Sequence, residues 1–189
     1  MSSKTQPKLP TFVEVAKAIK AEGNSKKGLF FQKFFKTGPG QYAEGDIFLG
    51  LTVPAQRIIS KQFSDLPLPD LDQLLKSKYH EFRLTALLII NLQFAAALKA
   101  GDEKTQKVIY DFYLSHTENI NNWDLVDASA RNIVGTYLLD KPRQILYKLV
   151  KSTNLWERRI SIIATFALLK NKDYADTLKI SELLLTDKH

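Results

Sequence analysis

The sequence contains no cysteine among its 189 residues. This absence excludes disulfide bonds, thiolate metal sites and iron–sulfur clusters. It also excludes enzymes that act through a cysteine nucleophile, including those that transfer a methyl group from DNA to a protein thiol.

Other sequence signals of chemistry are missing as well. The three histidines (His80, His116 and His189) are scattered, and no pair of them has the spacing of metal ligands. There is no HExxH, GxSxG, Walker A or GxGxxG motif, and the proline in Gly38-Pro39-Gly40 makes that segment a poor phosphate cradle. We therefore predict that the protein uses neither a metal nor a cofactor.

Targeting signals and long apolar runs are also scarce. Residues Met1–Pro10 lack the apolar core of a secretory signal. No apolar run approaches the roughly 18–20 residues that a membrane span needs. We expect a cytoplasmic protein that does not bind membranes, with residues 1–10 as a flexible tail and residues 11–189 as a single domain.

Positive charge is concentrated near the N-terminus. The first 36 residues hold eight lysines and two glutamates, whereas the whole chain carries a net charge of +7. A basic block of this kind suits a polyanion such as nucleic acid, although a solvated helix surface is an equally ordinary explanation.

The apolar pattern has the period of α-helices, and no segment alternates with a period of two. We predict an all-α fold with a long loop over Thr37–Asp46 and a break at Leu66–Pro69. The predicted helices cover roughly 13–22, 27–35, 54–65, 70–76, 80–98, 103–116, 122–138, 142–150, 155–169 and 174–185.

An internal repeat is visible in two parts of the chain. Leu74-Leu75-Lys76-Ser77 and Leu149-Val150-Lys151-Ser152 each end one predicted helix and precede another. One inserted residue aligns Arg83 with Arg159, at an offset of two units of about 38 residues. Such units predict HEAT-like repeats stacked into a curved solenoid, although a plain helical bundle is the alternative. The segment Leu184–Asp187 resembles the same helix end, so we expect that a last repeat is missing.

The segment Asn122–Asp127 holds the most informative residues. Either Asn121 or Asn122 suits a helix N-cap, which would place Trp123 and Asp127 on one face of the first turns. An aromatic face beside a carboxylate can hold a cationic ring. Alternatively, Trp123 continues an apolar stripe and Asp127 forms an ion pair with Arg131.

Two further groups are candidates for nucleic-acid contacts. Trp156 and Arg159 are three residues apart on one predicted helix, and an arginine fork matches a phosphate. The alternative is an arginine that packs between repeats, as Arg83 would at the aligned position. Lys33-Phe34-Phe35-Lys36 interleaves aromatic and basic residues, which a core helix with a basic outer face explains equally well.

Taken together, these segments resemble the AlkD-like DNA alkylation repair family. The similarity lies in Phe34–Tyr42, Glu44-Gly45-Asp46, Phe48-Leu49-Gly50, Val53-Pro54 with Arg57, Asn122–Asp127, and Trp156 with Arg159. It runs from about Phe12 to the last residue, with three separated motifs in the family's order.

The resemblance implies a HEAT-like repeat enzyme that excises positively charged N3- and N7-alkylated purines from double-stranded DNA. It implies Trp123 and Asp127 as active-site residues and Arg159 as a contact to the DNA backbone. It further implies that Trp156, Arg57 and Thr52 contact nucleic acid, and that the protein is a cytoplasmic, nucleoid-associated monomer of bacterial type.

The sequence also departs from the family pattern. Members usually continue for some tens of residues with another active-site tryptophan, and some carry glutamine where this chain has Thr52. The competing hypothesis is a non-catalytic helical-repeat module that binds DNA structures or a protein partner.

Overall fold

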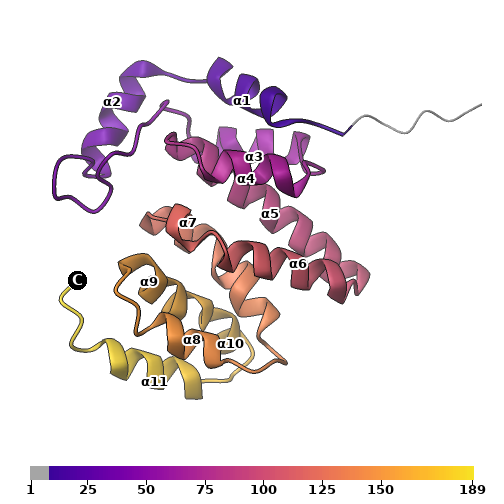
Figure 1. The fold of residues 1–189 in the computed structure, drawn as a ribbon, viewed down its shortest axis with the longest axis vertical. Coiled ribbons are helices and arrows are strands. Elements are labelled where there is room, and N and C mark those ends of the chain that lie inside the picture. Colours follow the sequence, from indigo (N-terminus) through magenta and orange to yellow (C-terminus); the bar gives the residue numbers. More distant parts are fainter. Residues whose placement is uncertain (1–8) are drawn as a thin grey trace, which may run out of the picture.

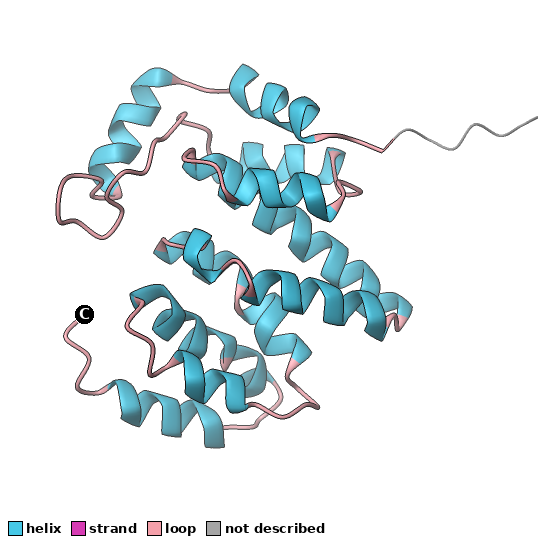
Figure 2. Ribbon diagram, viewed as in Figure 1, coloured by secondary structure: helices cyan, strands magenta, loops and turns pink. Residues whose placement is uncertain are grey.

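The computed structural model describes residues 9–189, which form helices joined by loops (Figures 1 and 2). Within them there is no strand, only one isolated bridge between Ile47 and Tyr79, so the all-α prediction is confirmed. Most of the tail predicted over residues 1–10 lies outside the described residues. In chain order the helices are α1 (Phe12–Ala21), α2 (Ser25–Phe34), α3 (Val53–Gln62), α4 (Leu68–Leu75), α5 (His80–Ala100), α6 (Glu103–Leu114), η1 (Thr117–Asn119), α7 (Trp123–Ser129), η2 (Arg131–Gly135), α8 (Gln144–Leu149), α9 (Leu155–Ala164), α10 (Phe166–Lys170) and α11 (Ala175–Leu184).

Polar side chains cap several helix starts. Asn24 accepts a hydrogen bond from the backbone N–H of Lys27 at 3.0 Å, and Asp102 accepts one from Thr105 at 3.0 Å. Asn154 accepts one from the backbone N–H of Trp156 at 2.9 Å. Each bond satisfies a backbone donor that the first turn of a helix leaves without an intrahelical partner.

The helices stack in successive layers that curve, as expected of a helical-repeat fold (Figure 1). The start of α7, the start of α9 and the loop after α2 lie on the same side of the stack. The long helix α5 is central to the stack and packs against α3, α4, α6 and α7. These contacts make α5 the scaffold on which the first turn of α7 is placed.

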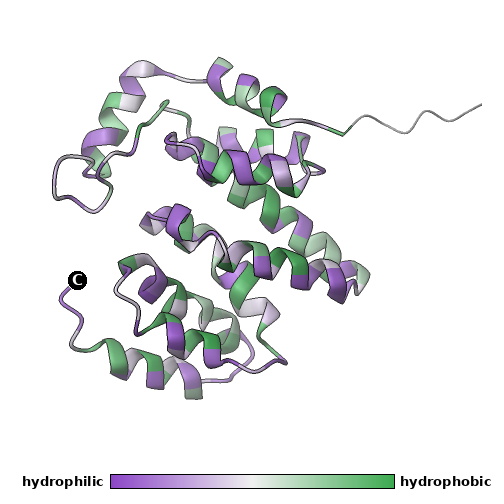
Figure 3. Ribbon diagram, in the orientation of Figure 1, coloured by the Kyte–Doolittle hydropathy of each residue, from purple (hydrophilic) through white to green (hydrophobic). Residues whose placement is uncertain are grey.

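Helix α5 corrects one expectation from the sequence. The helix has 21 residues, and an 18-residue window of it has a mean hydropathy of 1.4, so it could span a membrane by length and composition alone. In the structure, 67% of this window is buried inside the protein, and Figure 3 shows the apolar stretch of α5 among the other helices. The apolar character of α5 therefore supplies the core between neighbouring layers.

Two predicted helices are broken where they meet each other. The helix predicted over 122–138 is interrupted by the π-helical turn η2, and the helix predicted over 155–169 breaks at Thr165. A Cβ at Gly135 would lie 2.1 Å from the carbonyl oxygen of Ala164. Only glycine permits the backbones of η2 and α9 to pack this closely.

Glu81, in the first turn of α5, anchors the loop between α2 and α3. Its carboxylate, 1% exposed, accepts hydrogen bonds from the backbone N–H groups of Leu49, Gly50 and Leu51 at 2.9, 2.8 and 3.2 Å. Gly50 has a φ of +82°, and a Cβ there would lie 2.0 Å from the carbonyl oxygen of Asn24. The start of α2 therefore rests directly on this loop.

Candidate functional site

The first turn of α7 presents the residues that the sequence singled out. The side chain of Asn122, fully buried, accepts a hydrogen bond from the backbone N–H of Trp123 at 2.8 Å. The indole of Trp123 stacks on Phe35, with ring centroids 5.4 Å apart and an interplanar angle of 14°. Asp127 follows one turn later and is exposed. The cap and the stack together orient this turn.

Asp127 forms a two-point ion pair with Arg159 of α9. The Nε and Nη2 groups of Arg159 donate to the two carboxylate oxygens at 2.8 and 2.7 Å. The side chains are 36% and 37% exposed, so the pair is open to solvent. The alternative pairing of Asp127 with Arg131 is wrong, because the partner comes from the neighbouring repeat.

A cavity of about 350 Å³ lies beside this pair. Its lining joins the loop after α2 to α7, α9 and the end of α11, and it comprises Tyr42, Trp123, Leu155, Trp156, Arg158, Arg159, Ile162, Leu184, Asp187 and His189. Three of the predicted site residues thus line one cavity: Trp123, Trp156 and Arg159. Asp127 does not line the cavity itself, but it is bound to Arg159, which does.

Trp156 is placed differently from the other predicted site residues. It is only 8% exposed, and its ring meets Tyr42 edge-on at 6.0 Å and 71°. With so little of its surface open, it forms a wall of the cavity, and the small exposed part of its ring is all that a ligand can touch.

The structure corrects the register of the internal repeat. Arg83 donates through Nη1 to the backbone carbonyl of Ser77 at 2.9 Å, and Arg158 makes the same bond to Ser152 at 3.0 Å. The offset is 75 residues with no insertion, so Arg158, not Arg159, is the counterpart of Arg83. Arg158 also donates through Nε to Asp187 at 2.6 Å. The packing role expected of this arginine belongs to Arg158, which leaves Arg159 without a structural counterpart.

Arg57 and Thr52 lie apart from these residues. Arg57 is exposed and lines a separate hollow of about 230 Å³ with Lys61 and Asn132. Thr52 is the N-cap of α3, but its side chain makes no capping bond. Neither residue lines the cavity beside Trp123.

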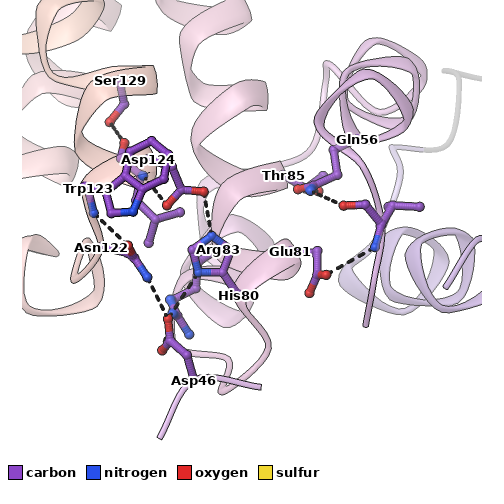
Figure 4. Close-up of polar contacts among 12 residues, drawn as sticks. Asp46, Gln56, His80, Glu81, Arg83, Thr85, Asn122, Trp123, Asp124 and Ser129 are labelled. Atoms are coloured by element: carbon purple, nitrogen blue, oxygen red, sulfur yellow. Dashed lines mark hydrogen bonds and ion pairs between the residues drawn. The ribbon is translucent and has the colours of Figure 1, made fainter. Parts of the chain in front are cut away.

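Sequence reasoning missed a buried polar network that anchors α7 (Figure 4). His80, 2% exposed, contacts Asp46 through Nδ1 at 3.2 Å and Asp124 through Nε2 at 2.8 Å. Its imidazole stacks on Phe48 with centroids 4.4 Å apart. Asp46 also accepts bonds from Arg83 at 2.6 Å and from the amide of Asn122 at 3.3 Å. No sequence signal pointed to this network, because its residues are far apart in the chain and only the fold brings them together.

Electrostatics favour the charged forms within this network. Burial lowers the pKa of His80, but its bonds to Asp124 and Asp46 outweigh burial and raise the pKa above its ordinary value. Burial raises the pKa of Asp46, and the bonds and charges of His80 and Arg83 outweigh this and lower it. A doubly protonated His80 donates to both carboxylates and ties the loop at Asp46 and the start of α5 to the start of α7.

The arrangement can bind a flat, electron-poor group and a phosphate side by side. Indole faces attract cations, a carboxylate at the cavity edge adds attraction, and an arginine fork fits phosphate oxygens. Within residues 9–189, no group of three histidine or carboxylate side chains is placed to hold a metal ion.

The fold and the site together define a helical-repeat protein with an aromatic, ion-paired cavity on one side of the stack. Residues 15–189 match the family model described as DNA alkylation repair enzyme, and the chain belongs to that family. The resemblance found in the sequence is thereby confirmed. No curated protein matches the chain.

Proposed function

We propose that this protein is a DNA glycosylase that removes positively charged N3- and N7-alkylated purines from duplex DNA. Membership of the DNA alkylation repair family supports a role in alkylation repair. The observation that carries the finer proposal is the Asp127–Arg159 ion pair beside the exposed part of Trp123. These three groups match the three demands of the reaction: a cationic base, a developing positive charge on the sugar, and a phosphate backbone.

The chemistry requires little from the protein. An N3- or N7-alkylpurine already carries positive charge, which weakens its glycosidic bond without a general acid. Cleavage passes through an oxocarbenium-like transition state, in which positive charge moves from the base to the sugar. The Asp127 carboxylate is suited to stabilise that charge or to position water for attack on the sugar.

Trp123 and Arg159 have complementary parts in this proposal. The indole of Trp123 offers a face to the cationic base, and its stack on Phe35 limits its movement. Arg159 holds Asp127 through two N–H groups and has three N–H groups left for a backbone phosphate. In this arrangement the lesion is held by its backbone as well as by its ring, in a monomeric enzyme acting on alkylated duplex DNA.

The direct test is release of the free bases 7-methylguanine and 3-methyladenine from methylated duplex DNA incubated with the protein. We expect both bases to appear without added metal or cofactor. Tight binding of the same DNA with no base released would contradict the glycosylase proposal and favour a non-catalytic DNA-binding module.

A further inference from the structure

A second cavity lies on the other side of Trp123 from the one described above. It measures about 260 Å³, and five of its twelve lining residues are phenylalanines from α2 and the loop that follows: Phe30, Phe31, Phe34, Phe35 and Phe48. Asp124, Glu81 and His80 form its polar end. The stacked pair Trp123–Phe35 stands between the two cavities, since Trp123 lines one and Phe35 the other.

The rim of this cavity is apolar and open to solvent. Phe30 and Phe34 are 62% and 56% exposed, and their rings stack with centroids 6.4 Å apart at 21°. Neighbouring aromatic rings exposed in this way usually mark a binding surface. Neither side chain belongs to the buried core, although Phe34 also meets Phe35 and Trp123 edge-on, with ring centroids 5.1 and 6.4 Å apart.

The helix that supplies three of these rings is basic, which favours an anionic partner. Helix α2 contains Lys26, Lys27 and Lys33 and no acidic residue, and Lys36 follows it. All four lysines are exposed. Aromatic rings interleaved with lysines are the combination that binds unstacked nucleic-acid bases, because the rings stack on a base while the lysines neutralise phosphates.

We propose that the phenylalanine cavity accepts one unstacked nucleobase of the bound DNA, next to the lesion site. Its apolar walls suit the faces of a base, and its polar end offers the Asp124 carboxylate to a base N–H group. Asp124 is 14% exposed at its side chain, so it is reachable from the cavity. The inference rests on the proposed function only in taking DNA as the ligand.

Binding of unmodified DNA tests the inference independently of excision. The probes are two labelled duplexes of equal length, one fully paired and one with a single unpaired nucleotide. The variants are Phe30→Ala/Phe34→Ala and, as a matched control, Leu29→Ala. Leu29 lies on the same helix and is 64% exposed, but it does not line the cavity. All three side chains are largely in solvent, so the variants should fold, and circular dichroism checks this.

We expect the parent chain to bind the duplex with the unpaired nucleotide about tenfold more tightly, the order expected for stacking of one base on aromatic rings. The double variant should lose this preference, and Leu29→Ala should keep it. Equal affinity of the parent chain for the two duplexes, or an equal loss in Leu29→Ala, would overturn the inference.

A crosslinking measurement locates the base. With 5-iodouracil as the unpaired nucleotide, irradiation should crosslink DNA to the tryptic peptides 28–33, 34–36 or 37–57, which carry the five phenylalanines of the cavity. Crosslinks confined to other peptides would overturn the inference. The inference would also fail if the double variant bound DNA like the parent chain but no longer self-associated, because the exposed rings would then be a contact between two copies of the chain. If the protein releases bases but shows no preference for the unpaired nucleotide, the proposed base-binding role of the cavity fails and the glycosylase proposal stands. If it shows the preference but releases no base, the glycosylase proposal fails and the role of the cavity stands.

Discussion

At the scale of single residues, the guanidinium of Arg159 serves two partners in the proposed mechanism. Two of its five N–H groups hold Asp127, at 2.8 and 2.7 Å. The other three remain for an incoming phosphate, so DNA can bind without releasing Asp127. A lysine offers a single point charge and does not hold both partners in one plane. The fork geometry therefore links backbone binding to the placement of the carboxylate.

Replacing this arginine should reveal its phosphate contact. For Arg159→Ala we expect weaker binding of duplex DNA and slower base release, because both the phosphate contact and the support of Asp127 are lost. The plot of log binding constant against log salt should become shallower by about one unit, as for loss of one phosphate contact. Arg131→Ala, an exposed arginine that does not line the cavity, is the control. An unchanged slope in Arg159→Ala would argue against a phosphate contact.

At the scale of elements, the start of α7 depends on a buried charge network. His80 lies between Asp46 and Asp124, while Arg83 holds the other oxygen of Asp46. The His80 pKa is raised in the folded state above its unfolded value of about 6.5. Its contribution to stability is therefore fully present below about pH 6.5 and is lost as the pH rises through the folded-state pKa.

The free energy of unfolding should consequently fall as the pH rises above about 6.5, the ordinary pKa of histidine. Asp124→Asn keeps the shape of the side chain but removes one of the charges that favour protonated His80. We expect this variant to lose about 1.5–3 kcal/mol at pH 6, as for a hydrogen bond to a charged group, and to show a flatter pH dependence. Urea unfolding across the pH range measures both effects, with His189→Gln as the control. A variant whose pH dependence matches that of the parent chain would exclude His80 as the source.

The close contact between η2 and α9 gives a second prediction at this scale. Gly135→Ala should lower the free energy of unfolding by about 1–3 kcal/mol, because its Cβ would lie 2.1 Å from the Ala164 carbonyl oxygen. Gly38→Ala is the matched control, since its Cβ would meet only the flexible side chain of Gln41. Thermal or urea unfolding of the two variants provides the comparison. Equal stabilities would show that α9 moves away at little cost.

At the scale of the whole molecule, the sequence predicted the helices well and their joints poorly. The period of apolar residues identified nearly every helix, because each helix buries one face against the next layer. The interruptions at η2 and at Thr165 were not foreseen, since they arise where two helices meet and depend on Gly135 facing Ala164. The repeat was visible, but its register was fixed only by the paired bonds of Arg83 and Arg158.

The site was predictable only in part for the same reason. Trp123 and Asp127 stood out because they lie four residues apart near a helix start. The partner of Asp127 was not predictable from local spacing, because Arg159 is 32 residues away and reaches it through repeat stacking. The network of Asp46, His80 and Asp124 joins still more distant segments. The cytoplasmic location and the monomeric state remain predictions.

The central claim is that the carboxylate of Asp127 acts on the sugar as the alkylated base departs. The measurement that tests it most directly is the single-turnover rate of 7-methylguanine release by Asp127→Asn, together with the affinity for the same DNA. Asp111→Asn is the control, because Asp111 is also an exposed carboxylate in an ion pair, with Lys107 at 2.6 Å on α6. We predict a loss of release of at least about a hundredfold in Asp127→Asn, the order of one electrostatic stabiliser. Its DNA affinity should change much less, and Asp111→Asn should behave like the parent chain. Release by Asp127→Asn at the parent rate would contradict the account.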